Sequence, residues 1–307
     1  MAHIGEGHAH HHHHEHVHSL ESLNTVFIVA IVLNLSFVAV EAGVGFTQNS
    51  LGLLSDAGHN LGDVFSLLLA LIAFKLAKIG HTRHFTYGYK KSTVLISLLN
   101  AIILLVAVGA IVIESMHKFA SPEVVNGAAV SWTAGVGIVV NGLTAWMLMK
   151  NQKHDINVRG AFLHMAADTL VSVGVVISGV VISVTGLYVI DPVISLCIAV
   201  IILVSTWRLL SESLRMSLDG IPEGVDMDKV KRLLESVPHV QGVHHIHVWA
   251  ISTTENALTA HVVIDDLNEL EDVKGKIKEK LRTEAGVQHS TIEVETPSCH
   301  CHNMTCD

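Results

Sequence analysis

Two H-x-x-x-D motifs lie in apolar stretches of the sequence that are long enough to be membrane helices. The first pairs His59 with Asp63, and the second pairs His164 with Asp168. A spacing of four residues places both side chains of a pair on one face of a helix. Two imidazoles and two carboxylates form a four-coordinate nitrogen and oxygen set, which suits Zn2+. The two motifs therefore predict a zinc site inside the membrane.

A purely structural role for these polar groups is the main alternative, because interhelical hydrogen bonds also stabilise membrane bundles. That role is usually filled by Ser, Thr, Asn or Gln, and seldom by two acids together with two histidines. An ionised Asp at the bilayer centre costs about 3 kcal/mol on insertion scales, so a membrane helix retains one for a functional reason. The composition of the two motifs favours metal binding.

The charges of such a site suggest how it would work. Zn2+ with two carboxylates and two neutral imidazoles has no net charge, whereas the empty site would carry two unpaired negative charges, which is costly in a low-dielectric bundle. Protons would neutralise the empty site, and metal ligands must be deprotonated to bind. Metal and protons should therefore compete, and a site exposed to each side of the membrane in turn would be a cation/proton antiporter.

The composition is that of an integral membrane protein. Hydrophobic residues make up 50% of the 307 residues and charged residues 15%, against about 25% charged in a typical soluble domain. The net charge of −9 comes largely from the C-terminal part, and no basic stripe suggests a nucleic-acid partner. Six apolar segments, each long enough for the ~20 residues that cross a bilayer, run over about residues 25–46, 52–78, 93–117, 127–150, 160–185 and 188–212.

The basic residues predict the orientation of these segments. Lys and Arg flank the loops between segments 2 and 3 and between segments 4 and 5, and they follow segment 6. The positive-inside rule then places both termini in the cytoplasm. The expected domains are a disordered His-rich tail (1–23), a six-helix transmembrane bundle (24–214), a small cytosolic α+β domain (215–296) and a Cys/His-rich tail (297–307).

The periodicity of the cytosolic part predicts the element order αββαβ. Met227–Val237 has a helical pattern after Asp226, a suitable N-cap, and Val243–Thr253 alternates as a strand does. Ala257–Ile264 is expected to be its hairpin partner, Leu270–Glu284 a second amphipathic helix and Ser290–Glu295 a final strand. The terminal His tract is expected to collect metal, with a purification tag as the alternative.

The chain resembles the cation diffusion facilitator family of zinc transporters, most of all its bacterial zinc/cadmium/cobalt-resistance branch. The matching residues are Ser50-Leu51, Leu54 to His59 with Asp63, Tyr87-Gly88-Tyr89, His164 to Asp168, and His247-Val248-Trp249-Ala250. The resemblance implies six transmembrane helices, a metallochaperone-like cytosolic domain, a homodimer in the bacterial inner membrane, and efflux of Zn2+, with Cd2+ or Co2+ as further substrates, in exchange for protons. It assigns the transport site to His59, Asp63, His164 and Asp168, and His59 favours zinc over cadmium.

Secondary metal sites are also expected. By resemblance, His244, His261, His289 and Glu295 match positions that bind a regulatory zinc ion, and Cys299 and Cys301 could join them. Strand alternation predicts that His245 and His247 share one face and that His244 lies on the other. The alternative is that these are ordinary surface histidines. His81 and His84 could hold a further ion in the loop between segments 2 and 3, which could equally be a solvated basic loop.

Three other functions compete with transport by alternating access. A zinc protease would need an H-E-x-x-H motif and an open coordination position, and four protein ligands would leave no room for a catalytic water; we therefore expect no enzyme and no cofactor. A metal sensor or chaperone would leave the acids of the apolar segments unexplained. A passive channel or an importer is not excluded by the ligands, because only the resemblance gives the direction of transport.

Overall fold

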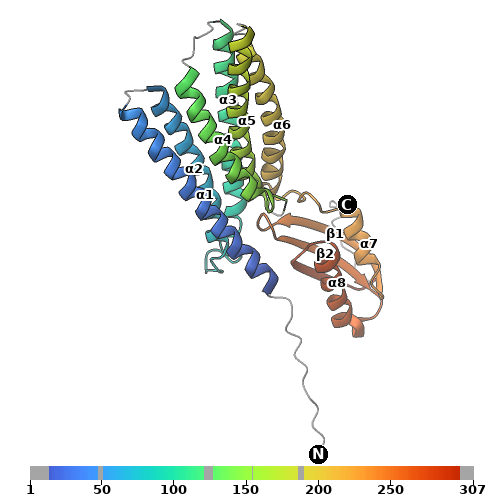
Figure 1. Cartoon of the computed structure of the whole chain (residues 1–307). Coiled ribbons are helices and arrows are strands. Elements are labelled where there is room, and N and C mark those ends of the chain that lie inside the picture. Colours follow the sequence, from blue (N-terminus) through green and yellow to red (C-terminus); the bar gives the residue numbers. More distant parts are fainter. Residues whose placement is uncertain (1–13, 48–50, 121–126, 154, 186–189, 298–307) are drawn as a thin grey trace, which may run out of the picture.

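Six long helices form an elongated bundle, and a small α+β domain lies at one end of it (Figure 1). The computed structural model describes residues 14–47, 51–120, 127–153, 155–185 and 190–297. The helices of the bundle are α1 (His14–Thr47), α2 (Leu51–Ala77), α3 (Ser92–Ala120), α4 (Gly127–Met149), α5 (Ile156–Thr185) and α6 (Ile190–Ser217). The predicted fold class is confirmed.

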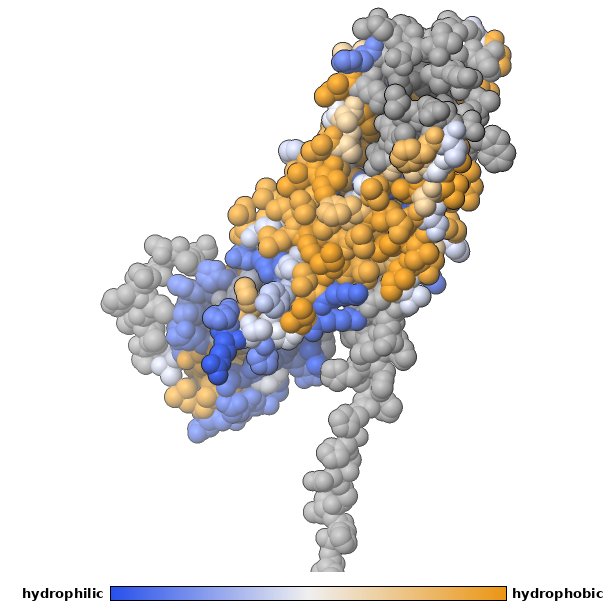
Figure 2. Space-filling view, turned by 90° about the vertical axis from the view of Figure 1, so that its left-hand side faces the viewer, coloured by the Kyte–Doolittle hydropathy of each residue, from blue (hydrophilic) through white to orange (hydrophobic). Residues whose placement is uncertain are grey.

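The outer surface of the bundle is apolar enough to face lipid. Four helices are long and apolar enough to cross a membrane within the described ranges: Thr25–Val44, Asn60–Ala77, Ser92–His117 and Pro192–Ser217. The apolar part of α4 that can be described, Gly135–Met149, is shorter, and α5 carries polar residues along its first half. On the face drawn in Figure 2, hydrophobic residues predominate over the coloured part of the bundle and hydrophilic residues over the coloured part of the small domain.

The helices of the bundle pack in pairs, α3 against α6, α4 against α5 and α1 against α2. At Gly174 of α5, a Cβ atom would lie 2.5 Å from Ile198 Cδ1 of α6, so the absence of a side chain lets the Ile198 side chain pack directly against the backbone of α5. Asn34 of α1 donates a hydrogen bond to Thr144 Oγ1 of α4 at 3.0 Å, and both residues are buried. A small residue in one helix pair and an interhelical hydrogen bond in another therefore add to the apolar packing between the helices.

The first helix is longer than expected. The His-rich tail was expected to be disordered to residue 23, but α1 already begins at His14. Residues 14–24 contain neither Gly nor Pro. Because the apolar part of α1 has already formed a helix, these residues can extend it without the cost of nucleation. Residues 1–13, with the rest of the His tract, lie outside the described part of the chain.

The small domain has helices on one face of a three-stranded sheet. Its elements are α7 (Met227–Glu235), β1 (Val240–Ala250), β2 (Asn256–Ile264), the 3-10 turn η1 (Leu267–Glu269), α8 (Leu270–Glu284) and β3 (His289–Glu295). The strand order is β1-β2-β3; β1 pairs antiparallel with β2, and β3 pairs parallel with β2. The order αββαβ is confirmed, and Asp226 caps α7 by accepting from Asp228 N and Lys229 N. Val230, Leu258 and Ile277 are among the residues of the core between helices and sheet.

The loop between β1 and β2 contacts the transmembrane bundle. Thr253 N donates to Thr93 Oγ1 of α3 at 3.1 Å, and Thr253 Oγ1 donates to Asp155 Oδ2, just before α5, at 3.0 Å. Burial raises the pKa of the Asp155 carboxyl, and hydrogen bonds from Asn157 and Thr253 oppose this effect. Ala250, at the end of β1, packs into an apolar cluster with residues of α3, α5 and α6. One hairpin therefore links the sheet to three membrane helices.

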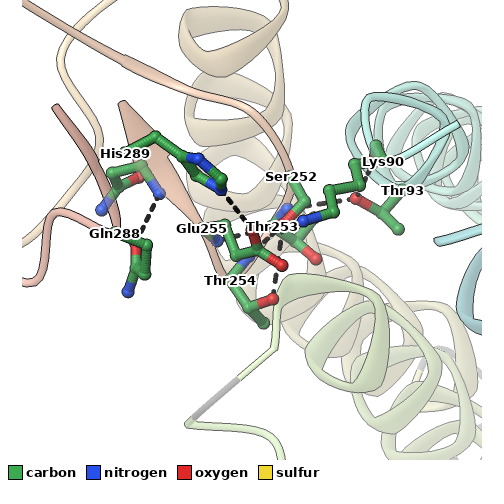
Figure 3. Close-up of polar contacts among 9 residues, drawn as sticks. Lys90, Thr93, Ser252, Thr253, Thr254, Glu255, Gln288 and His289 are labelled. Carbon is green, nitrogen blue, oxygen red and sulfur yellow. Dashed lines mark hydrogen bonds and ion pairs between the residues drawn. The ribbon is translucent and has the colours of Figure 1, made fainter. Parts of the chain in front are cut away.

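Glu255, in the same loop, joins the bundle to β3 (Figure 3). Its Oε2 atom accepts from Lys90 Nζ at 2.6 Å and lies 3.2 Å from His289 Nε2. Partial burial raises the pKa of the Glu255 carboxyl, but the hydrogen bonds and charges of Lys90 and His289 outweigh it, so the pKa lies below its ordinary value. The carboxylate is therefore held in its charged form at neutral pH.

This lowered pKa predicts a pH-dependent contribution to stability. Because the pKa of Glu255 is lower in the folded protein than in the unfolded chain, its contribution is complete above the ordinary pKa of glutamate and is lost as the pH falls through the lowered value. We expect the difference in thermal unfolding midpoint between the wild-type protein and Glu255→Gln to be present at pH 7 and to shrink only as the pH falls below the ordinary pKa of glutamate, about 4.3. A difference that stays constant with pH would contradict this role for the carboxylate.

Candidate metal centres

A cluster of acidic and histidine side chains lies between α2 and α5, inside the bundle. His164 Nε2 lies 2.7 Å from Asp63 Oδ1 and 3.8 Å from Asp168 Oδ2. The three side chains offer ligand atoms that all lie within 4.8 Å of one another. Asp63 is 1% exposed and His164 is 4% exposed, so the cluster is shielded from the surroundings of the bundle. A buried group of this kind is suited to hold a divalent cation.

Apolar packing next to the cluster sets the register of α2 and α5. Leu67 of α2 lies one turn after Asp63, and Ala161 of α5 lies one turn before His164; both belong to one buried cluster that also includes Phe27 of α1. A change of register would move these side chains out of the core, which costs about 1.5–3 kcal/mol for a residue such as Leu. The packing of these helices therefore places the polar groups opposite one another.

His59 lies in α2, one turn before Asp63, but its side chain is outside what the structure describes. The helical backbone keeps both residues on one face of α2. Of the four residues expected in the transport site, three are therefore seen together, and the position of the fourth, the imidazole of His59, stays a prediction.

Glu41 of α1 is a further buried acidic residue, and it contacts the part of α2 that carries the candidate ligands. It is 2% exposed, and its Oε2 atom accepts a hydrogen bond from Asn60 Nδ2 at 2.7 Å. Asn60 directly follows His59 and precedes Asp63 by three residues. An acid within an apolar helix is itself a functional signal, so Glu41 could have been found from the sequence. The contact ties α1 to the part of α2 that carries the candidate ligands.

A second cluster lies on the sheet of the small domain. His261 Nδ1 of β2 is 2.6 Å from Glu295 Oε1 of β3, and His244 Nε2 of β1 is 3.5 Å from Glu295 Oε2. The ligand atoms of these three side chains also lie within 4.8 Å of one another. Strand pairing brings the residues together, because His244 is paired with His261, and the parallel strand β3 carries Glu295 alongside β2. Three of the residues predicted for the cytosolic site are thus neighbours.

His289 does not lie with these residues, although it was predicted to join them. It begins β3, whereas Glu295 ends that strand, and at about 3.3 Å per residue the two positions are about 20 Å apart. His289 instead contacts Glu255 and packs its ring edge-on against Tyr87, with 6.0 Å between ring centroids. The parallel register of β3 carries it to the end of the sheet that faces the bundle.

The ring of His245 lies beside the ring of His244, whereas strand alternation predicted that the two side chains would lie on opposite faces of the sheet. A shift in the pairing of β1 and β2 occurs between His244 and His247, and His245 has a φ of 51°, in the left-handed region. The resulting β-bulge interrupts the alternation of side chains. The ring of His245 therefore lies beside the rings of His244 and His261 rather than on the opposite face of the sheet.

The remaining predicted ligands are not assembled into sites. His81 and His84 are exposed in the α2–α3 loop, and the ligand clusters found within the described ranges do not include them. Cys299 and Cys301 lie outside the described residues. One H-E-x-x-H pattern occurs in the full sequence, at residues 14–18 of the His tract. It lies before the apolar part of α1, and the side chains there are also outside the described part.

Comparison with known proteins agrees with this architecture. The family model for the cation efflux transmembrane domain matches residues 27–216, and the model for the cation efflux protein cytoplasmic domain matches residues 222–297. A cadmium, cobalt and zinc/H(+)-K(+) antiporter of Bacillus subtilis is 35% identical over 91% of this chain and 90% of its own length. Zinc transporter ZitB of Escherichia coli is 35% identical over 87% of this chain and 86% of its own length.

Two further matches concern the metal cation efflux system protein CzcD of Cupriavidus metallidurans. The whole protein is 32% identical over 96% of this chain and 92% of its own length. A solved structure of its metal-bound C-terminal domain is 32% identical, covers 23% of this chain and 99% of that domain, and has a TM-score of 0.22. The family models and the full-length relatives together show that this chain belongs to the cation diffusion facilitator family of zinc, cadmium and cobalt transporters and is an integral membrane transport protein, not an enzyme.

Proposed function

We propose that this protein exports Zn2+ from the cytoplasm in exchange for protons, by alternating access at a site formed by His59, Asp63, His164 and Asp168. The observation that carries the proposal is the cluster of Asp63, His164 and Asp168, whose ligand atoms lie within 4.8 Å of one another in the bundle. A buried carboxylate and imidazole are costly in a bilayer unless they are paired or bind a cation. Zn2+ is the substrate here, and the site has the nitrogen and oxygen donors that it prefers.

Charge balance supports proton exchange. Two Asp carboxylates and two neutral imidazoles neutralise one Zn2+ ion, whereas the metal-free site would hold two negative charges in a low-dielectric bundle. His164 Nε2 lies 2.7 Å from Asp63 Oδ1, so the imidazole and the carboxylate are close enough to share a proton. Release of Zn2+ on one side would then be accompanied by uptake of protons, and binding on the other side by their release.

The names of relatives support the choice of substrate and the exchange of ions. The relatives from Bacillus subtilis and Escherichia coli are named for zinc, and the former also for cadmium, cobalt and antiport with H(+) and K(+). We propose Zn2+ as the main substrate because His59 matches the position that favours zinc by resemblance, with Cd2+ and Co2+ as further substrates.

We also propose a homodimer in the bacterial inner membrane, with both termini in the cytoplasm. Basic residues in the α2–α3 and α4–α5 loops support this orientation through the positive-inside rule. The small domain would then lie in the cytoplasm, where Zn2+ bound by His244, His261 and Glu295 would regulate transport. The His-rich N-terminus and Cys299 and Cys301 would supply metal from the cytoplasmic side.

Transport in proteoliposomes tests the main proposal. Purified protein is reconstituted with a zinc-sensitive dye inside the vesicles, and zinc uptake is followed with and without a pH gradient that is acidic inside. We expect the gradient to accelerate zinc entry and zinc entry to release protons from the vesicles. Zinc flux without proton movement would indicate a channel and would refute exchange; binding without flux would indicate a sensor or chaperone.

A further inference from the structure

Asp155 is a buried acid directly before α5, the helix that carries His164 and Asp168. It is 8% exposed. Its backbone carbonyl accepts a hydrogen bond from Arg159 N at 3.0 Å, and its Oδ1 atom accepts from Asn157 N at 2.7 Å. These two contacts are those of a helix N-cap. Asp155 therefore fixes the residue at which α5 begins.

The first residues of α5 depend on this cap. Ile156 and Val158 are β-branched and Gly160 lacks a side chain, and all three favour a helix less than alanine does. At 1.5 Å per residue, His164 lies about 14 Å along the helix from the cap. A change at Asp155 therefore acts on the short, weakly helical stretch that leads to the candidate ligands.

The small domain holds the other oxygen of the same carboxylate. Thr253, in the loop between β1 and β2, donates from Oγ1 to Asp155 Oδ2 at 3.0 Å. The backbone N–H of Thr253 donates to Thr93 Oγ1 of α3 at 3.1 Å (Figure 3), which limits the movement of the loop relative to α3. One carboxylate is therefore shared between the start of α5 and the small domain.

Apolar packing connects the same two parts of the molecule. Ala250, at the end of β1, belongs to a buried cluster with Ile156, the first residue of α5, and Leu163 packs against this cluster. Leu163 directly precedes His164. Because close-packed interiors transmit small displacements, the position of the small domain can act on the backbone at His164 through packing as well as through the cap.

A pocket borders this junction. It has a volume of about 260 Å3, and the residues that line it include Asp155, Arg159, Glu212 and Thr253. Close packing is what resists displacement in a protein interior, and on this side of the β1–β2 loop it is missing. The hydrogen bond of Thr253 therefore has a large share in deciding where the loop lies relative to Asp155.

We infer that Asp155 is a positioning residue for the transport site and that Thr253 sets its position from the small domain. The inference rests on the proposed transport site in the bundle, and it gives roles to two residues that do not touch the metal. The β1–β2 loop would set where α5 begins, and so how His164 and Asp168 are presented to Zn2+. A change in the small domain would then reach the ligands through a single side-chain contact.

The zinc dependence of transport in proteoliposomes tests the role of Thr253. Thr253→Val removes the hydroxyl and keeps the shape, Thr253→Ser keeps the hydroxyl, and Thr254→Val is the matched control, because the exposed Thr254 contacts Ser252 within the loop. We expect Thr253→Val to raise the KM for zinc about threefold or more with little change in maximal rate, and the other two variants to keep the wild-type KM. A merely structural role would lower the amount of folded protein, and so the maximal rate, without moving the KM.

Two substitutions of Asp155 separate positioning from charge. Asparagine is an equally good N-cap, and its amide can donate to Thr253 Oγ1, so Asp155→Asn should keep a KM near that of the wild type. Asp155→Ala should raise the KM at least as much as Thr253→Val does, and Thr253→Val should have no further effect in that background. Equal impairment of Asp155→Asn and Asp155→Ala would overturn the inference, because the charge itself would then be needed, as would an additive effect of Thr253→Val.

Hydrogen exchange in detergent measures the cap without any transport. Thr253→Val should accelerate amide exchange in residues 156–160 relative to Thr254→Val, because a less supported cap lets the first turn open more often. Equal exchange in the two variants would overturn the inference. Zinc flux of the wild-type protein tests the proposed function separately: a wild type without flux would refute that function and leave the exchange rates to decide the role of the cap.

Discussion

Cells that carry Asp168→Ala should lose their protection against zinc while they make normal amounts of protein. Asp168 faces His164, with 3.8 Å between Oδ2 and Nε2, and it provides the second carboxylate of the cluster. Its removal leaves Zn2+ with one unneutralised charge in a low-dielectric bundle. Because removal of a mere outer-shell partner costs about 10–100-fold in metal affinity or activity, we expect the zinc transport rate to fall at least tenfold.

Growth at increasing zinc concentrations, with protein levels checked by immunoblot, measures this effect. Asp168→Asn retains the size of the side chain and should fail as Asp168→Ala does, because the charge is what the metal needs. Thr169→Ser is a matched control in the same turn of α5: the Thr169 hydroxyl bonds to Met165 O within the helix at 2.8 Å, and serine keeps that bond. Unchanged zinc protection in Asp168→Ala cells would reject this cluster as the transport site.

Lys91→Met should loosen the small domain from the transmembrane bundle. Lys91 Nζ donates to Asp219 Oδ1 at 2.6 Å, to Met216 O at 2.8 Å and to Ala250 O at 3.0 Å. It therefore joins the start of α3 to the end of α6 and to the end of β1. Methionine keeps the apolar stem but no donor. Because the Lys91 and Asp219 side chains are 36% and 67% exposed, solvent screens much of their interaction, and we expect the substitution to cost about 1 kcal/mol.

Thermal unfolding in detergent and limited proteolysis between α6 and α7 measure this loosening. We expect a lower unfolding midpoint and faster cleavage near residues 218–226 for Lys91→Met. Lys78→Met is the matched control, because Lys78 is exposed after α2. Transport should also fall in Lys91→Met vesicles although the candidate ligands are intact. An unfolding midpoint and a cleavage rate equal to those of the control would show that the junction is held by the hairpin loop alone.

Local patterns predicted much of the fold and the centre of the candidate site. The helix Leu270–Glu284 has the predicted bounds, and Asp226 is an N-cap as expected, because amphipathic periodicity and capping depend on neighbouring residues. The i, i+4 spacing of His164 and Asp168 places both on one face of α5 and so identified them in the same way. Local spacing was informative wherever a helix carried the residues.

Features that depend on distant parts of the chain were not predictable from these patterns. The bulge at His245 depends on how β1 pairs with β2, and the position of His289 depends on the parallel register of β3. The contacts of Lys91 join residues that are far apart in the sequence. In each case tertiary packing determines which residues become neighbours. The periodicity of a single sequence carries no information about that packing.

The polar first half of α5 has a consequence for the way the protein enters the membrane. α5 carries Arg159, His164 and Asp168, and an Asp or Arg at a helix centre costs about 2.5–3.5 kcal/mol during insertion by the translocon. Alone, α5 would partition poorly into lipid. It packs closely against α4 and α6, so we expect the three helices to leave the translocon together, and a ribosome stalled before α6 to leave α5 unable to integrate stably.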